Sequence, residues 1–115
     1  RPGRPEEVRL CDLAHRHPSV TKAAAFGVAD ERLGEKVCLA VIVRDAARVS
    51  ARDMLDHLFA AGLSKYDMPE YFAIVDAFPL TASGKVLKRE LIDWTRSGRL
   101  RPESVRFIEQ ERPAP

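Results

Sequence analysis

Two short apolar runs, residues 23–28 and residues 37–43, constrain the fold of this chain more than any other feature of its sequence. Each run has the length of one strand, and the second is rich in valine and isoleucine, which favour strands. The polar segment between them, residues 29–36, is too short to contain a helical crossover. The sequence therefore predicts two neighbouring strands that pair antiparallel.

Other patterns predict helices around this pair of strands. Pro5, followed by two glutamates, suits the first turn of a helix, and Pro18 ends that helix. Ser50 and Asp53 have the spacing of a capping box, and the apolar residues after them recur at helical spacing. A third strand is expected at residues 71–75, and the final helix carries one apolar stripe, formed by Leu87, Leu91 and Trp94.

The predicted order is helix, strand, strand, helix, strand, helix. This order is typical of an α+β domain in which a small, mostly antiparallel or mixed three-stranded sheet has helices packed on its faces. We expect residues 1–98 to form this domain. Residues 99–115 contain three prolines and no sustained period, so we expect them to form an extended tail.

Composition argues against several classes of function. The 115 residues allow one modest core, and a net charge of +2 is too small to indicate binding to nucleic acid. No apolar run approaches the roughly 18 residues of a membrane span, and no signal-peptide pattern opens the sequence. Cys11 and Cys38 lie in apolar settings typical of buried thiols in a reducing compartment, which predicts a cytoplasmic protein. His15, His17 and His57 lack partners at ligand spacing, so no metal site is expected.

The stretch PLTASGKVLKREL, residues 79–91, places a lysine between a turn of small residues and the start of a basic helix. The Gly84-Lys85 step invites comparison with a phosphate-binding P-loop. That motif requires glycine where Pro79 stands and serine or threonine where Val86 stands, so the P-loop interpretation fails.

The same stretch still offers a geometry that could meet an anion. The turn before the lysine is formed by Thr81, Ser83 and Gly84. If the helix began at the lysine, one face would carry Lys85, Lys88 and Arg89 beside unpaired backbone amides. Such a place suits phosphate or carboxylate oxygens, although spacing alone favours a solvated basic helix start.

PLTASGKVLKREL resembles the closing signature of the acyl-adenylate-forming superfamily, which includes acyl-CoA synthetases, luciferases and adenylation domains of peptide synthetases. Further stretches resemble the family in the same order along the chain: PEEV at residues 5–8, HPSV at 17–20, AAAFGVADERLGEKV at 23–37 and LSKYDMPEYF at 63–72. The resemblance covers residues 5–95 and corresponds to the small C-terminal domain of these enzymes. The large N-terminal domain, which holds most of the ATP and acid sites, is absent, so the chain looks like a fragment or an excised domain.

The resemblance assigns the catalytic lysine of the family to Lys85. There it neutralises charge as the carboxylate of the acid attacks the α-phosphate of ATP, with Thr81, Ser83 and Gly84 near the phosphates. The resemblance also implies that Mg²⁺ accompanies ATP outside this chain, and that the domain then turns for thioester formation with CoA. In relatives with similar turns this lysine is acetylated, which implies a lysine acetyltransferase as a possible partner.

Residues near CoA are less well matched. Tyr66 falls where related ligases place an aromatic side chain near the adenine of CoA, but it could equally pack on Met68 or Phe72. Where some relatives carry basic residues for the 3′-phosphate of CoA, this chain has Met68 and Glu70, and Lys65 is only a weak substitute. The segment at residues 30–35 is expected to be a conformational turn.

The resemblance therefore implies an acid–CoA ligase that uses ATP and releases AMP and pyrophosphate. One alternative is an adenylation domain of a peptide synthetase, although there the motif usually reads asparagine-glycine-lysine followed by valine-aspartate. Another is a non-catalytic interaction module with the same fold, against which the presence of Lys85 argues. The expected partner is the N-terminal domain of the same protein, and that domain selects the acid.

Overall fold

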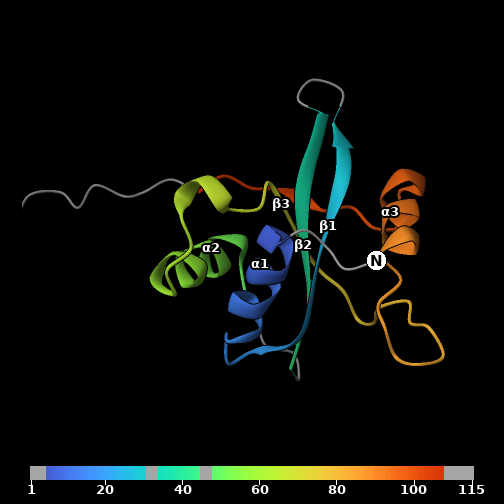
Figure 1. Cartoon of the computed structure of the whole chain (residues 1–115), viewed down its shortest axis with the longest axis horizontal. Coiled ribbons are helices and arrows are strands. Elements are labelled where there is room, and N and C mark those ends of the chain that lie inside the picture. The colour runs from blue at the N-terminus through green and yellow to red at the C-terminus, as the bar shows by residue number, and fades with distance from the viewer. Residues whose placement is uncertain (1–4, 31–33, 45–47, 108–115) are drawn as a thin grey trace, which may run out of the picture.

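The computed structural model describes residues 5–30, 34–44 and 48–107 and has four helical segments around one sheet (Figure 1). The helices are α1 (Pro5–His15), α2 (Ala51–Ala60), the 3₁₀ turn η1 (Lys65–Asp67) and α3 (Lys88–Ser97). The strands are β1 (Val20–Asp30), β2 (Gly34–Val43), β3 (Tyr71–Ile74) and β4 (Glu103–Ser104). The centre of the expected turn, residues 31–33, lies outside the described residues.

The sheet is mixed and has the strand order β1-β2-β3-β4. The predicted hairpin is confirmed, because β1 and β2 pair antiparallel in a register that places Ala24 opposite Ala40. β3 pairs parallel with β2, because α2 carries the chain back across the sheet between them. The α+β fold class is therefore confirmed.

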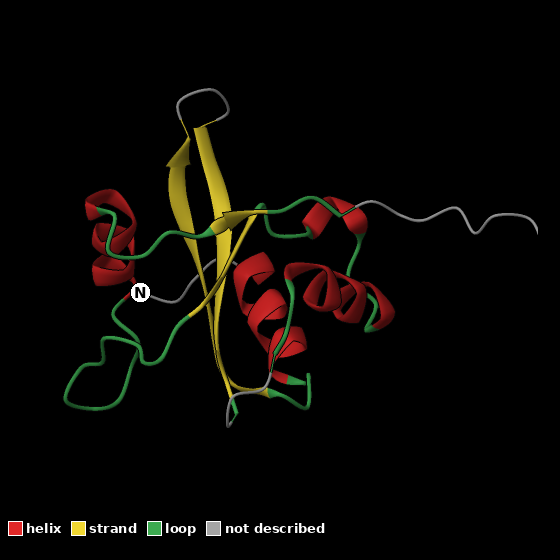
Figure 2. Ribbon diagram, turned by 180° about the vertical axis from the view of Figure 1, so that it is seen from behind, coloured by secondary structure: helices red, strands yellow, loops and turns green. Residues whose placement is uncertain are grey.

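The two faces of the sheet bury separate apolar clusters, because successive side chains of a strand point to opposite faces. On one face, Ala25 of β1 packs with residues of α1 and α2, including Leu10 and Leu58. On the other face, Ala24 and Phe26 pack with Leu91 of α3. Figure 2 shows this division, with α1 and α2 on one side of the strands and α3 on the other. The sheet is thus covered on both faces.

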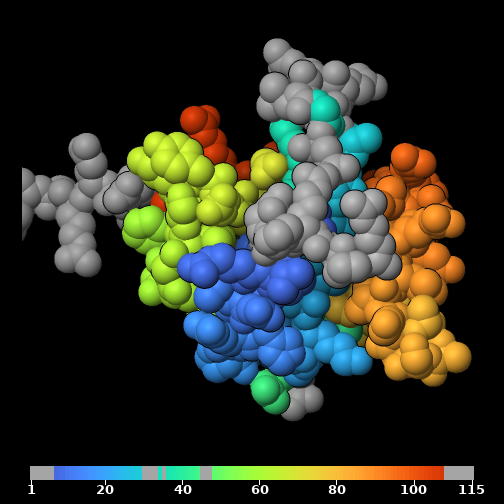
Figure 3. Space-filling view, viewed as in Figure 1, coloured from blue at the N-terminus to red at the C-terminus, as the bar shows by residue number. Residues whose placement is uncertain are grey.

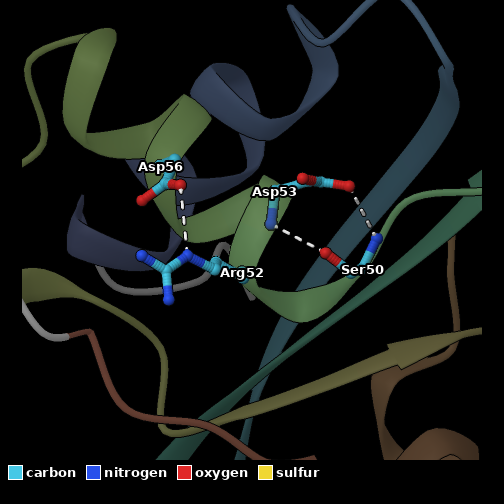
Figure 4. Close-up of polar contacts among 4 residues, drawn as sticks. All are labelled: Ser50, Arg52, Asp53 and Asp56. Atoms are coloured by element: carbon cyan, nitrogen blue, oxygen red, sulfur yellow. Dashed lines mark hydrogen bonds and ion pairs between the residues drawn. The ribbon is translucent and has the colours of Figure 1, made fainter.

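The predicted capping box at the start of α2 is present (Figure 4). The hydroxyl of Ser50 accepts a hydrogen bond of 3.0 Å from the amide of Asp53, and the carboxylate of Asp53 accepts one of 3.2 Å from the amide of Ser50. These bonds satisfy two amides that the helix itself leaves unpaired. One turn further, Arg52 and Asp56 form an exposed ion pair with 3.8 Å between Nε and Oδ2.

The segment after α3 adds a fourth strand that the sequence analysis did not expect. β4 pairs antiparallel with β3, and the amide of Val105 donates a 2.8 Å hydrogen bond to the carbonyl of Glu70. Phe107 then stacks on Phe59 of α2, with ring centroids 4.9 Å apart. A two-residue strand has no hydrophobic alternation to recognise in a sequence, so only its pairing with β3 identifies it. Among the described residues, no helix is long and apolar enough to cross a membrane.

Candidate active-site loop

The loop at residues 79–87 is closed by its own backbone. Leu80 and Val86 form an antiparallel bridge, and the amide of Leu87 donates a 2.8 Å hydrogen bond to the carbonyl of Pro79. Phe78, just before the loop, and Leu91, in α3 after it, are both buried in the apolar cluster on the α3 side of the sheet. The loop therefore leaves and re-enters the domain at one place, and its gold surface projects beside α3 (Figure 3).

The tip of the loop is a tight turn from Thr81 to Lys85. The amide of Gly84 donates to the carbonyl of Thr81 at 2.9 Å, and the amide of Thr81 donates to the carbonyl of Lys85 at 2.8 Å. Gly84 has a φ of 90°, a backbone conformation that residues with a Cβ rarely adopt. The predicted small-residue turn is present, but internal hydrogen bonds give it a defined shape.

The hydroxyl of Thr81 organises this tip. It accepts a 3.0 Å hydrogen bond from the amide of Lys85 and lies 3.0 Å from the hydroxyl of Ser83. The structure therefore brings together in one turn all four residues that the sequence predicted at this site: Thr81, Ser83, Gly84 and Lys85. Nothing in residue spacing alone indicated the hydrogen bond between Thr81 and Lys85.

Lys85 is exposed at the end of this turn. Within the part of the chain that the structure describes, no carboxylate forms an ion pair with its ammonium group. The expectation that Lys85, Lys88 and Arg89 share one helical face is wrong, because α3 begins only at Lys88. The bridge between Leu80 and Val86 encloses a tight turn that includes Lys85, so the backbone at Lys85 cannot also form the first turn of a helix. Lys85 therefore lies in the turn, whereas Lys88 and Arg89 lie in α3.

Lys88 and Glu7 form a contact that the sequence analysis missed. Nζ of Lys88, the first residue of α3, lies 3.4 Å from Oε1 of Glu7, whose side chain is only 8% exposed. The two residues are 81 positions apart in the sequence. The sequence shows two adjacent glutamates in the first helical turn and gives no sign that Glu7 is buried, so it offered no signal for a distant cationic partner.

Tyr66 and Lys65 lie in η1, on the side of the sheet that carries α2, whereas the Lys85 loop lies beside α3 (Figures 1 and 2). Tyr66 is 86% exposed as a residue, so it does not pack against Met68 or Phe72. Nζ of Lys65 lies 5.4 Å from the centre of the Tyr66 ring, which is within the range of a cation–π contact. The structure therefore does not bring Tyr66 to Lys85.

Met68 and Glu70, which stand where some relatives have basic residues, both make contacts that stabilise the fold. Met68 is buried in the cluster formed with α1 and α2. The carboxylate of Glu70 accepts a 3.1 Å hydrogen bond from the amide of Val37 at the start of the β2–β3 pairing. Neither side chain is suited to hold a phosphate.

Both cysteines are free, and burial raises the pKa of each thiol. The pKa of Cys38, which is fully enclosed, rises to about 12. The ring nitrogens of the histidines contact backbone groups: His15 bonds to the carbonyl of Thr21, His57 to that of Leu13, and His17 accepts from the amide of Ser19. Among the described residues, no group of three side chains could hold a metal ion.

Comparison with known proteins identifies related chains. The family model of the AMP-binding enzyme C-terminal domain matches residues 12–85. A salicylyl-CoA synthase / salicylate adenylyltransferase from Streptomyces sp is 38% identical over 91 residues, which are 79% of this chain and 16% of that protein. A mitochondrial medium-chain acyl-CoA ligase from Macaca fascicularis is 36% identical over 83 residues, which are 71% of this chain and 13% of that protein.

A solved structure shares the fold. ATP-bound MatB from Rhodopseudomonas palustris superposes with a TM-score of 0.72 at 26% identity, covering 78% of this chain and 18% of that one. This chain therefore spans less than a fifth of the length of each of these relatives.

Proposed function

The chain belongs to the family of AMP-binding enzyme C-terminal domains, and from this premise we propose that it acts as the small domain of an ATP-dependent, AMP-forming acid–CoA ligase. In the first half-reaction, the carboxylate of an acid attacks the α-phosphate of ATP, forming an acyl-adenylate and releasing pyrophosphate. In the second, the thiol of CoA gives up its proton and its sulfur displaces AMP, forming a thioester. Relatives named as a salicylyl-CoA synthase and a medium-chain acyl-CoA ligase support this reaction.

The proposal rests on three observations about Lys85. Its side chain is exposed, it has no anionic partner among the described residues, and its backbone is held by hydrogen bonds within the turn. The turn fixes the point from which this side chain extends, and a cation brought against phosphoryl oxygens stabilises the charge that develops on them. Lys85 is thus the proposed catalytic residue of the first half-reaction.

The remaining residues of the loop hold the turn beside the phosphates. Thr81 and Ser83 bond to each other and Thr81 bonds to the amide of Lys85, so their hydroxyls set the shape of the tip. Gly84 permits the backbone conformation that reverses the chain. ATP is a substrate, its Mg²⁺ is bound by the N-terminal domain of the same protein, and the acid pocket lies in that domain.

CoA is the substrate of the second half-reaction, and Tyr66 and Lys65 are the proposed contacts to its adenine and phosphate. The exposed ring of Tyr66 offers a stacking surface, and Lys65 lies beside it. Because η1 and the Lys85 loop lie on opposite sides of the sheet, one docked position could not present both to the same cleft (Figure 1). The domain therefore turns between the half-reactions.

A second candidate function is adenylation of an acid that is then passed to a carrier protein instead of CoA. The relative whose name includes salicylate adenylyltransferase favours this candidate. A non-catalytic module is disfavoured, because an exposed lysine on a defined turn serves no structural purpose in this domain.

The deciding experiment uses the full-length protein that carries this domain. A panel of carboxylic acids is screened for acid-dependent exchange of pyrophosphate into ATP, and CoA is then added to each active acid. Formation of an acyl-CoA thioester, detected by mass spectrometry, supports the ligase. Exchange without thioester supports transfer to a carrier protein, and no exchange with any acid favours the non-catalytic module. The 115-residue chain alone should be inactive in both assays.

A further inference from the structure

Lys88 occupies a position that is electrostatically unfavourable for a cation. It is the first residue of α3, where the helix dipole favours negative charge, and Leu87 before it makes no side-chain cap. The carboxylate of Glu7, with 3.4 Å between Oε1 and Nζ, lies directly against this ammonium group and adds to the negative charge that Glu90 of α3 already places in the first turn. The contact therefore offsets a charge that α3 alone would disfavour.

Glu7 gives this ion pair more weight than an ordinary surface pair. Its side chain is 8% exposed, against 39% for that of Lys88, so the carboxylate has little access to water. A buried carboxylate that loses a charged donor loses part of what offsets its desolvation penalty, whereas an exposed pair contributes little. Glu7 also lies in the first turn of α1, where the dipole of that helix favours its negative charge.

The pair joins two helices that lie on opposite faces of the sheet. α1 packs in the cluster that contains Ala25 of β1, and α3 packs in the cluster that contains Ala24. β1 is an edge strand of the sheet, and both helices contact it. Lys88 also acts on Cys11 of α1. Burial raises the pKa of the Cys11 thiol, and the positive charge of Lys88 partly opposes that rise. Lys88 is thus anchored to α1 around the edge formed by β1.

This anchor lies three residues after Lys85. The two ends of the loop at residues 79–87 are paired with each other through their backbones. The loop is therefore attached to the rest of the domain at only two neighbouring places, Phe78 and the first turn of α3. Fixing that turn therefore fixes the direction in which the tip of the loop points. We propose that the Glu7–Lys88 ion pair orients the Lys85 loop for adenylate formation, so that Lys88 and Glu7 are positioning residues; this inference rests on the proposed function.

The kinetic test compares Lys88→Met and Glu7→Gln in the full-length protein. Each variant should slow adenylate formation by about 10- to 100-fold, because displacing a reacting group by about 1 Å has effects of that size. The loss should fall on kcat, with little change in KM for ATP, and the double variant should be no slower than either single variant. Thioester formation from a synthetic acyl-adenylate should continue.

Two variants serve as controls. Lys88→Arg keeps the charge and the donors and should restore the rate, whereas Lys22→Met removes an exposed lysine of β1 and should leave the rate unchanged. If Lys88→Met fails to fold, Glu7→Gln, which preserves side-chain size, and Lys88→Arg decide the question. If Lys88 instead bound ATP directly, Lys88→Met would raise KM for ATP and Glu7→Gln would not reproduce its effect, which would overturn the proposal.

A structural measurement on the 115-residue chain separates orientation from catalysis. In Lys88→Met, ¹⁵N relaxation should show the order parameters of the Gly84 and Lys85 amides falling from about 0.85 toward about 0.6, while those of β2 stay high. Unchanged order parameters together with an unchanged rate would refute the positioning role. If the wild-type protein shows no acid-dependent pyrophosphate exchange, the proposed function fails. If Lys85→Ala leaves adenylate formation intact, the catalytic role of Lys85 fails; if only the Glu7 and Lys88 variants keep the wild-type rate, the positioning claim alone fails.

Discussion

Thr81 and Lys85 are hydrogen-bonded to each other in both directions. The amide of Thr81 donates to the carbonyl of Lys85 at 2.8 Å, and the amide of Lys85 donates to the hydroxyl of Thr81 at 3.0 Å. The backbone of the lysine is therefore fixed while its side chain stays exposed. The turn therefore fixes the point from which the side chain extends, and the ammonium group stays available to an anion that docks against the loop.

Lys85→Ala in the full-length protein should slow adenylate formation by about 100-fold or more, because removing one preorganised group costs this much in other active sites. Thioester formation from a synthetic acyl-adenylate should be almost unaffected, because the ammonium acts on charge in the first half-reaction only. Pyrophosphate exchange and single-turnover thioester assays measure the two steps. An equal loss in both would indicate damage to the domain or to its motion.

Thr81→Val should slow adenylate formation by about 10-fold, because it removes the hydroxyl that accepts from the amide of Lys85 and leaves side-chain size nearly unchanged. Thr81→Ser keeps that hydroxyl and is the matched control. The exchange assay used for Lys85→Ala applies here as well. If Thr81→Val and Thr81→Ser behave alike, the hydroxyl has no part in holding the lysine.

Gly84→Ala should destabilise the turn by about 1–2 kcal/mol, because a φ of 90° is strained for a residue with a Cβ. No atom lies within 4 Å of the added Cβ, so the cost is backbone strain and not a steric clash. Gly84→Asn should cost less, since asparagine tolerates the left-handed region better. Urea unfolding of the 115-residue chain measures both, and equal losses would contradict the role of φ.

Acetylation of Lys85 should abolish adenylate formation without changing the melting temperature. The modification removes the charge, and the exposed ammonium makes no ion pair among the described residues that folding would lose. The test treats the full-length protein with a lysine acetyltransferase and acetyl-CoA, maps the modified lysine by mass spectrometry and restores activity with a deacetylase. Full activity of protein acetylated at Lys85 would reject both the regulation and the catalytic role of Lys85.

Cys38 should contribute to stability at neutral pH and lose that contribution in alkali. Its pKa is raised by burial from 9.0 to about 12, so the folded state holds the proton more tightly than the unfolded state does. The contribution is complete below pH 9 and is lost as the pH rises toward 12. The free energy of unfolding of wild type and Cys38→Ala, measured by urea titration at several pH values, should converge over this range; parallel curves would contradict the shift.

The elements that local patterns encode were predictable from the sequence. The hairpin, the capping box of α2 and the turn before Lys85 all appear where the residues indicated them. Each depends on contacts between residues close in the chain or on a hydrophobic period that one strand or helix displays by itself. Family resemblance then distinguished Lys85 from other exposed lysines, which spacing alone could not do.

Tertiary structure decided what depends on distant partners. The start of α3 is at Lys88 and not at Lys85, because the pairing of Leu80 with Val86 competes with the helix for the intervening backbone. Likewise, β4 exists only because β3 offers it an edge. The contact of Lys88 with Glu7 spans 81 positions and joins helices from opposite faces of the sheet. No local pattern encodes such a contact, because it forms only when the sheet places both helices against the same edge strand.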